Sequence, residues 1–147
     1  MLCREVMNRN VVVCTEGDTV ADCARRMRDH CIGFVPVVDG GGQVSGVVTD
    51  RDLALRVVGE GLSLDTPLGT IMTRDVRICR PWDSLRAAER KMAAVRKSRL
   101  VVADEDGGCA GVISLSDIAQ ADTRALAGHV LYEITQREAR PAPRRPA

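Results

Sequence analysis

The sequence predicts an α/β fold in which two copies of one βαββα unit pack as a pseudo-twofold pair. Shifting the 147-residue chain by 65 positions aligns several residues without a gap, among them Met7 with Met72, Gly46 with Gly111 and Asp52 with Asp117. Over residues 7–54 about 14 of about 48 positions are identical, where ordinary composition would give about 3. Duplication of one unit is the simplest explanation, and each element is expected twice.

Each copy opens with a short apolar run that predicts a strand, at 11–14 and at 76–79. Turn-prone residues and an N-cap candidate follow, and then a helix pattern begins in both copies. Its apolar residues recur at helical spacing, as Val20, Cys23, Ala24 and Met27 in the first copy and as Leu85, Ala88, Met92 and Val95 in the second. This stripe predicts one buried helix face in each copy.

Two further apolar runs in each copy flank a turn, which predicts a β-hairpin. In the first copy 34–38 and 44–48 flank 39–43, and in the second 100–103 and 110–113 flank 104–108. The glycine-rich stretch 40–46 resembles a phosphate-binding loop, but it lies between two strands and not before a helix, so a hairpin turn is the prediction. A second short helix is expected after Thr49 and after Ser114.

These patterns divide the chain into two units with a connection and an extension. The predicted segments are a first unit at 1–58, a linker at 59–70, a second unit at 71–122, a C-terminal helix at 123–138 and a disordered tail at 139–147. Within the linker, Thr66 and Pro67 match an N-cap and a first helical residue, which predicts a short helix leading to Met72.

Composition and charge exclude several classes of partner. Lys and Arg number 21 against 20 Asp and Glu, so a formal charge of +1 provides no global field to attract nucleic acid or a membrane surface. Phe34, Trp82 and Tyr132 are the three aromatic residues, too few for stacking exposed bases. The first residues lack a signal-peptide pattern and no window approaches a membrane span, so a cytoplasmic protein is expected.

The six cysteines suggest buried apolar residues more than chemistry. They are scattered without a C-x-x-C pair, and the two histidines do not add a zinc-ligand spacing. The sequence therefore predicts neither a metal site nor a redox pair. Catalysis is also unsupported, because no nucleophile or carboxylate pair stands in a recognisable setting, so the chain is not expected to be an enzyme.

The sharpest local pattern is a hydroxyl residue followed three positions later by aspartate, as Thr49 with Asp52 and as Ser114 with Asp117. At a helix start this is a variant capping box that satisfies free backbone N–H groups without any ligand. The same groups suit a nucleotide, because a helix start and a nearby arginine hold phosphate and a carboxylate accepts from ribose hydroxyls. Spacing alone does not separate these two interpretations.

Several stretches resemble the CBS domain family, in which two such domains stand in tandem. They are 33–39 (GFVPVVD), 46–53 (GVVTDRDL) and 111–118 (GVISLSDI), and the resemblance spans 5 to about 122. It implies a non-catalytic regulatory pair that senses adenine-containing ligands such as AMP, ATP, NAD or S-adenosylmethionine. It also implies that two pairs form a disk-like homodimer.

The resemblance places ligands in the cleft between the repeats, which implies two nucleotide sites. The first would contain Met7, Asn10, Val12, Ile32, Gly33, Arg99, Ser114, Ser116 and Asp117, with Arg99 on phosphate and Asp117 on ribose. The second would contain Thr49, Arg51, Asp52, Asp75, Arg77, Lys97 and Ser98. The sites are not expected to be equivalent, because Leu115-Ser116 replaces the charged pair Asp50-Arg51 and Val101 replaces Pro36.

The leading hypothesis is therefore a regulatory module with an adenine nucleotide as its regulatory ligand, no obligatory cofactor and an effector protein of unknown identity. The alternative is a ligand-free dimerisation or protein-interaction scaffold in which Asp52 and Asp117 only cap helices. A homodimer is expected in either case, because apolar helix faces such as Val20/Cys23/Met27 and Leu53/Val57 would be only partly covered in a single pair.

Overall fold

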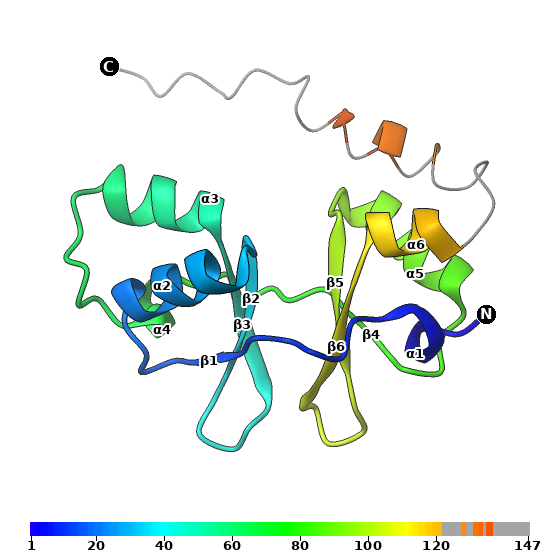
Figure 1. Ribbon diagram of the computed structural model, residues 1–147, viewed down its shortest axis with the longest axis horizontal. Helices are drawn as coiled ribbons and strands as arrows, with labels where there is room; N and C mark the ends of the chain where they lie inside the picture. The colour runs from blue at the N-terminus through cyan, green and yellow to red at the C-terminus, as the bar shows by residue number, and fades with distance from the viewer. Residues whose placement is uncertain (122–127, 129–130, 134, 137–147) are drawn as a thin grey trace.

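A computed structural model describes residues 1–121, 128, 131–133, 135 and 136, and it contains two like α/β units side by side (Figure 1). The first comprises β1 (Cys14–Thr15), α2 (Val20–His30), β2 (Phe34–Val38), β3 (Val44–Thr49), α3 (Asp50–Asp52) and the π-helical segment η1 (Leu53–Val58). The second comprises β4 (Ile78–Cys79), α5 (Leu85–Val95), β5 (Arg99–Ala103), β6 (Cys109–Ser114) and α6 (Leu115–Ala121). The expected helix at 123–138 lies mostly, and the expected tail at 139–147 entirely, outside the described residues.

Each unit contains a three-stranded sheet, in the order β1-β2-β3 and β4-β5-β6. The first two strands of each sheet are parallel and the last two form the predicted antiparallel hairpin. The predicted opening strands are too long, because pairing begins only at Cys14 in the first unit and at Ile78 in the second. The chain before Cys14 comes from the other unit, where Asn8 is paired with Val112.

The glycine-rich stretch after β2 is a hairpin turn, as predicted. Gly42 has a φ of +81° and Gly107, at the equivalent place, has a φ of +86°. Glycine adopts this left-handed region without the steric cost of a Cβ atom. Asp39 Oδ1 accepts from the backbone N–H groups of Gly41 and Gln43 at 2.9 and 3.0 Å, so these amides are occupied within the turn.

The two long helices begin and end alike. Thr19 Oγ1 caps α2 by accepting from Asp22 N at 3.1 Å, and Ser84 Oγ caps α5 by accepting from Ala87 N at 3.2 Å. Both helices end at a left-handed residue with a φ of 52°, Cys31 in the first unit and Arg96 in the second. The duplication therefore extends to the backbone conformation of the helix ends.

Of the helix-face residues that we expected to remain partly uncovered, Leu53 is half-buried, whereas the others are core residues of this chain. Val20, Cys23 and Met27 are at most 7% exposed, and Val57 is 2% exposed. That part of the prediction is wrong because the sheet and helix α4 (Leu68–Ile71) cover these residues. The exposed apolar side chains of this region are instead Leu55 and Val58 of η1.

The segments that precede the two units are exchanged between them. Helix α1 (Cys3–Val6) lies beside the second unit in Figure 1, and Cys3 and Met7 belong to that unit's core. Helix α4 lies in the first unit, whose core contains Leu68, Ile71 and Met72. Backbone hydrogen bonds join each of these helices to the same unit as its core residues. Cys3 N donates to Asp83 O of the second unit and Leu68 N donates to Asp18 O of the first, both at 2.9 Å.

The short helix predicted within the linker is present but begins one residue later. Pro67, with a ψ of 143°, is the N-cap of α4, and Leu68 is its first helical residue. The prediction that Thr66 caps this helix is therefore wrong. Proline does fit the cap position, since no helical hydrogen bond requires an N–H group there.

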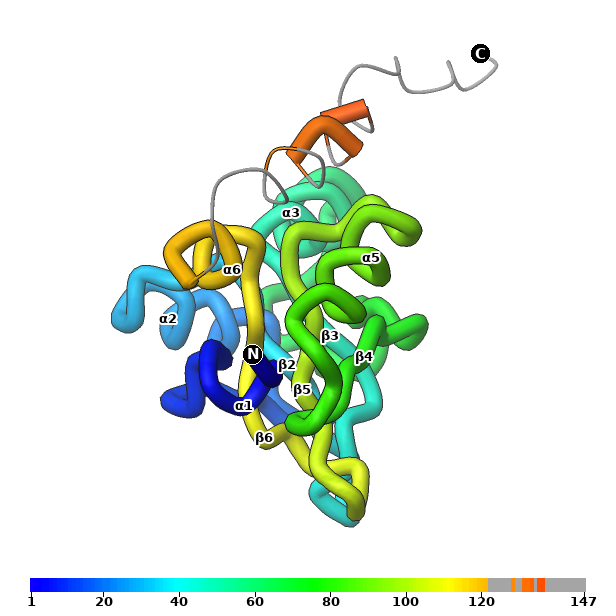
Figure 2. The backbone as a smooth tube through the Cα atoms, turned by 90° about the vertical axis from the view of Figure 1, so that its right-hand side faces the viewer, coloured from blue at the N-terminus to red at the C-terminus, as the bar shows by residue number. Residues whose placement is uncertain are grey.

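The crossing segments pair with the edge strand of the opposite unit. Asn8 and Val112 exchange two backbone hydrogen bonds of 2.9 and 3.0 Å, and Thr73 and Val47 exchange two of 2.9 Å. A hydrogen bond of 2.9 Å from Val44 N to Gly107 O joins the tips of the two hairpins. Figure 2 shows both tips at the same end of the molecule. No helix in the described part of the chain has the length and apolar character needed to cross a membrane.

Four of the six cysteines are buried, as predicted, but Cys31 is exposed and Cys109 is half-buried. The four buried cysteines form two thiol pairs that the sequence did not reveal. Cys14 and Cys23 lie in the first core, and Cys3 and Cys79 in the second. A hydrogen bond with Cys23, assisted by Arg26 against the effect of burial, lowers the pKa of Cys14 to about 7. Arg26 Nη1 lies 3.1 Å from Cys14 Sγ.

These thiols predict that stability rises with pH between about 7 and 9. The unfolded chain retains a proton on Cys14 up to the ordinary pKa of 9.0, whereas the folded chain has already released it. The trend reverses at higher pH, because hydrogen bonding with Cys14 and burial raise the pKa of Cys23. The hydrogen bond with Cys79 lowers the pKa of Cys3, so Cys3 also makes stability rise with pH, as Cys14 does.

Urea unfolding under reducing conditions between about pH 6 and pH 10 measures this dependence. Cys14→Ala is expected to flatten the rise, while Cys31→Ser, at an exposed thiol, is expected to retain it. An unfolding free energy that is constant or falls between about pH 7 and pH 9 in the unmodified chain would contradict the assignment.

Candidate functional site

A cavity of about 820 Å³ lies between the two units, at the end of the hairpins opposite their tips. It is lined by residues from the first unit, by residues of the segments that precede β4 and β5, and by Arg99, the first residue of β5. All seven residues predicted for the second site line it: Thr49, Arg51, Asp52, Asp75, Arg77, Lys97 and Ser98. Its volume is within the roughly 300–1,000 Å³ that is typical of ligand sites.

The starts of β2 and β5 meet at this cavity. Gly33 and Arg99, both predicted for the first site, line it instead of a separate cleft. Gly33 O accepts from Asp50 N at 3.1 Å, and Ser98 O accepts from Leu115 N at 2.9 Å, so each strand start is held by the helix of its own unit. A Cβ atom at position 33 would lie 2.6 Å from Asp50 Oδ2, so the Asp50 side chain would have to move if position 33 were not glycine.

Sequence reasoning missed seven further residues of the lining. They are Phe34, Val47, Asp50, Leu55, Arg56, Thr73 and Val76. Most lie next to predicted residues in the chain, so a wider window around each motif would have included them. Thr73 had no such signal, because its position depends on the backbone pairing with Val47 across the two units.

The hydroxyl and aspartate motifs act as capping boxes in both units. Asp52 Oδ2 accepts from Thr49 N at 2.9 Å and from Thr49 Oγ1 at 3.0 Å, while Asp52 N donates to Thr49 Oγ1 at 3.2 Å. Asp117 Oδ2 accepts from Ser114 N at 2.7 Å and from Ser114 Oγ at 2.5 Å. The capping interpretation is therefore confirmed, and it leaves Asp52 Oδ1 directed to Arg56 Nε at 3.5 Å.

Basic side chains dominate the charge of the cavity. The cations are Arg51, Arg56, Arg77, Lys97 and Arg99, and the acids are Asp50, Asp52 and Asp75. Arg56 donates to Ile71 O at 2.6 Å, and Arg77 forms an ion pair with Asp75. Within the described part of the chain the side chains of Arg51, Lys97 and Arg99 have no ion pair or hydrogen bond.

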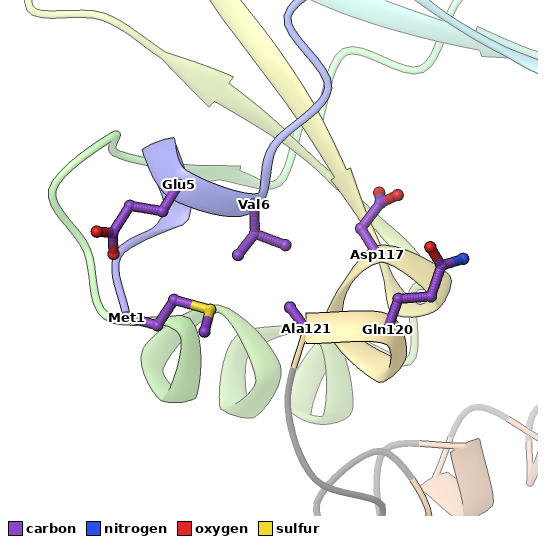
Figure 3. A pocket seen from close by; sticks show the side chains of 6 residues that line it. All are labelled: Met1, Glu5, Val6, Asp117, Gln120 and Ala121. Atoms are coloured by element: carbon purple, nitrogen blue, oxygen red, sulfur yellow. The ribbon is translucent and has the colours of Figure 1, made fainter.

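The residues predicted for the first site have several different surroundings. Met7 is 8% exposed and packs in the second core, while Asn10 is exposed and Val12 and Ile32 are half-buried. Ser114 Oγ and Ser116 Oγ lie 2.8 Å apart. Asp117 lines a shallow pocket of about 430 Å³ with Met1, Glu5, Val6, Gln120 and Ala121, and Figure 3 shows the carboxyl groups of Asp117 and Glu5 on opposite sides of it.

The residues that line the cavity differ in charge from the residues at the equivalent positions of the other repeat. Positions 65 residues apart pair the cations of the cavity with uncharged residues on the other side: Arg51 with Ser116, Arg56 with Ala121, Arg77 with Val12 and Lys97 with Ile32. The structure thus concentrates positive charge in one of two related places. Among the described residues, no group of three or more His, Cys, Asp or Glu is arranged to hold a metal ion.

Two βαββα units that exchange their preceding helices, with a cavity between them, define a tandem-repeat α/β module. A family model for the CBS domain matches residues 3–59 and 68–124. The chain therefore belongs to the CBS domain family and contains a pair of these domains, as the sequence resemblance predicts.

Relatives of similar length share this organisation. The chain is 31% identical over 116 residues to the CBS domain-containing protein YhcV of Bacillus subtilis, covering 79% of this chain and 81% of that protein. A putative signal-transduction protein with CBS domains from Burkholderia ambifaria superposes with a TM-score of 0.68 at 34% identity, covering 79% and 87% of the two chains. CBSX2 in complex with AMP superposes with a TM-score of 0.71 at 24% identity, covering 82% and 94%, and shares the fold.

The same domains also occur within longer proteins. Relatives named homoserine O-acetyltransferase match this chain over 22–25% of their length. The enzymatic activity in those names belongs to proteins about four times the length of the matched region, so it is not assigned to this chain.

Proposed function

We propose that this CBS pair is a non-catalytic regulatory module that binds an adenine-containing nucleotide in the 820 Å³ cavity between its units. The observation that carries the proposal is the convergence of residues from both units on one cavity, with unpaired cations beside apolar side chains. A ligand bound there touches both units and therefore favours one arrangement of the pair, which an effector protein can read. The AMP complex of CBSX2 supports this class of ligand.

The lining offers a partner for each part of a nucleotide. Phe34, Val47 and Val76 provide apolar surface for a base. Asp52 provides a carboxylate oxygen, Oδ1, that is not used by the capping box and suits a ribose hydroxyl. Arg51 and Lys97 provide charge for phosphate, since cations bind phosphate oxygens by charge-assisted hydrogen bonds.

Calorimetry with AMP, ATP and NAD, followed by urea unfolding with the best ligand, tests the proposal. Ligand at 100 times its dissociation constant is expected to raise the free energy of unfolding by about 2.7 kcal/mol. The absence of both heat and stabilisation at millimolar concentrations of all three compounds would exclude it.

Asp52→Asn and Asp117→Asn form a matched pair, because both carboxylates accept the same two bonds of a capping box. Both variants are expected to lose about 0.5–2 kcal/mol of stability. Only Asp52→Asn is expected to weaken nucleotide binding, by about fivefold, since it lines the cavity and Asp117 does not. Unchanged affinity in Asp52→Asn would remove this carboxylate from the ligand site.

A ligand-free dimerisation scaffold is the second candidate, and exposed apolar side chains favour it. Leu55 and Val58 on η1 are 55% and 77% exposed. Such side chains are suited to pairing with a second copy, as the predicted homodimer requires. A dimer in sedimentation together with no heat from any nucleotide would favour this function over the first.

A further inference from the structure

We infer that the cavity selects nucleotides with two or more phosphates, so that ADP and ATP bind more tightly than AMP. The inference rests on the proposed function and specifies its ligand class. It follows from the number, origin and pairing of the cations that line the cavity.

The first argument is the distribution of paired and unpaired charge. The guanidinium groups of Arg56 and Arg77 are held by protein acceptors. Asp50 Oδ1 accepts from Arg51 N at 2.8 Å, so this carboxylate is occupied by the backbone and not by the Arg51 guanidinium. Lys97 and Arg99 have no acceptor within the described residues, and a polyanion is the ligand that satisfies such a set.

The second argument is the separation of these cations in the fold. Arg51 belongs to α3 of the first unit, whereas in the second unit Lys97 lies between α5 and β5 and Arg99 is the first residue of β5. A monophosphate carries up to about two negative charges on a single group. Each further phosphate adds charge and extends the anionic chain, so that a diphosphate or triphosphate can contact cations from both units at once.

The third argument comes from the repeat. The positions equivalent to Arg51, Lys97 and Arg99 are Ser116, Ile32 and Phe34, all of them uncharged. Both units fold alike, so the βαββα fold does not require a cation at any of these positions. The three cations are an addition to one cavity, and ligand recognition is the role that explains their convergence.

The decisive experiment is calorimetry of the full chain with adenosine, AMP, ADP and ATP, without Mg²⁺, at low and at physiological salt. ADP and ATP are expected to bind at least about tenfold more tightly than AMP, and this ratio is expected to shrink with salt. Arg51→Gln and Lys97→Gln are expected to weaken ATP about five- to tenfold and AMP by less than about threefold. Arg90→Gln, an exposed cation of α5 outside the cavity, is the matched control and is expected to leave all affinities unchanged.

Each contrary result has a distinct meaning, provided that the variants unfold at the same urea concentration as the unmodified chain. Equal affinities for AMP, ADP and ATP would overturn the phosphate selectivity and leave the proposed function standing. Equal losses for AMP and ATP in Arg51→Gln and Lys97→Gln would overturn it as well. No binding of adenosine, of any of the three nucleotides or of NAD would overturn both.

Discussion

Replacing Leu68 by alanine is expected to lower the free energy of unfolding by about 2–5 kcal/mol. Leu68 lies in the connection between the repeats, yet its side chain is completely buried. It is the first residue of α4 and packs in the core of the first unit with Val20, Val35 and Val57. The substitution removes buried methyl groups and leaves a cavity, because the surrounding sheet and helices relax only partly.

Urea unfolding followed by two independent probes measures this effect. Leu64→Ala is the matched control, since Leu64 belongs to the same connection but its side chain is 62% exposed. Its stability is expected to change by less than about 0.5 kcal/mol. If Leu68→Ala were as mild as the control, α4 would not be a structural part of the first unit, and the exchange of lead-in segments would be wrong.

Replacing Gly111 by alanine is expected to lower the free energy of unfolding by about 1–3 kcal/mol. A Cβ atom at this position would lie 2.9 Å from the backbone oxygen of Asn8 and 2.8 Å from Met7 Sδ. Asn8 cannot retreat freely, because it exchanges two hydrogen bonds with Val112. The added methyl group therefore pushes the segment around Asn8 away from strand β6 of the second unit.

Gly46→Ala is the internal comparison for this change. Gly46 occupies the equivalent place in the first unit, but the nearest atoms to its added Cβ are all from the flexible side chain of Met72. A flexible side chain can rotate away, so Gly46→Ala is expected to cost less than Gly111→Ala. The same urea titration compares the two, and a larger loss in Gly46→Ala would contradict the role assigned to the Asn8 backbone.

The local order of the fold was predictable from the sequence. The 65-residue repeat, the turn residues around Gly42 and Gly107 and the N-caps Thr19 and Ser84 all depend on neighbours close in the chain. Hydrogen bonds and side-chain spacing within a hairpin or helix turn act over a few residues, so they leave a readable pattern. The family and the paired α/β architecture follow from that pattern and its repetition.

The family resemblance brought residues of both copies together in the predicted second site, but the tertiary structure alone decided which lead-in segment joins which core and where Arg99 lies. Leu68 precedes the second unit but packs in the core of the first, and Cys3 precedes the first unit but packs in the core of the second. Arg99 lines the cavity together with Arg51 and not with Asp117. Nothing in the sequence marks these contacts, because the two copies are equal in sequence order and their relative placement depends on long-range packing. The sequence by itself determined two like units and a hydroxyl–aspartate motif in each. The packing determined that one cavity between the units collects the positive charge, since residues distant in the chain become neighbours only when the units meet.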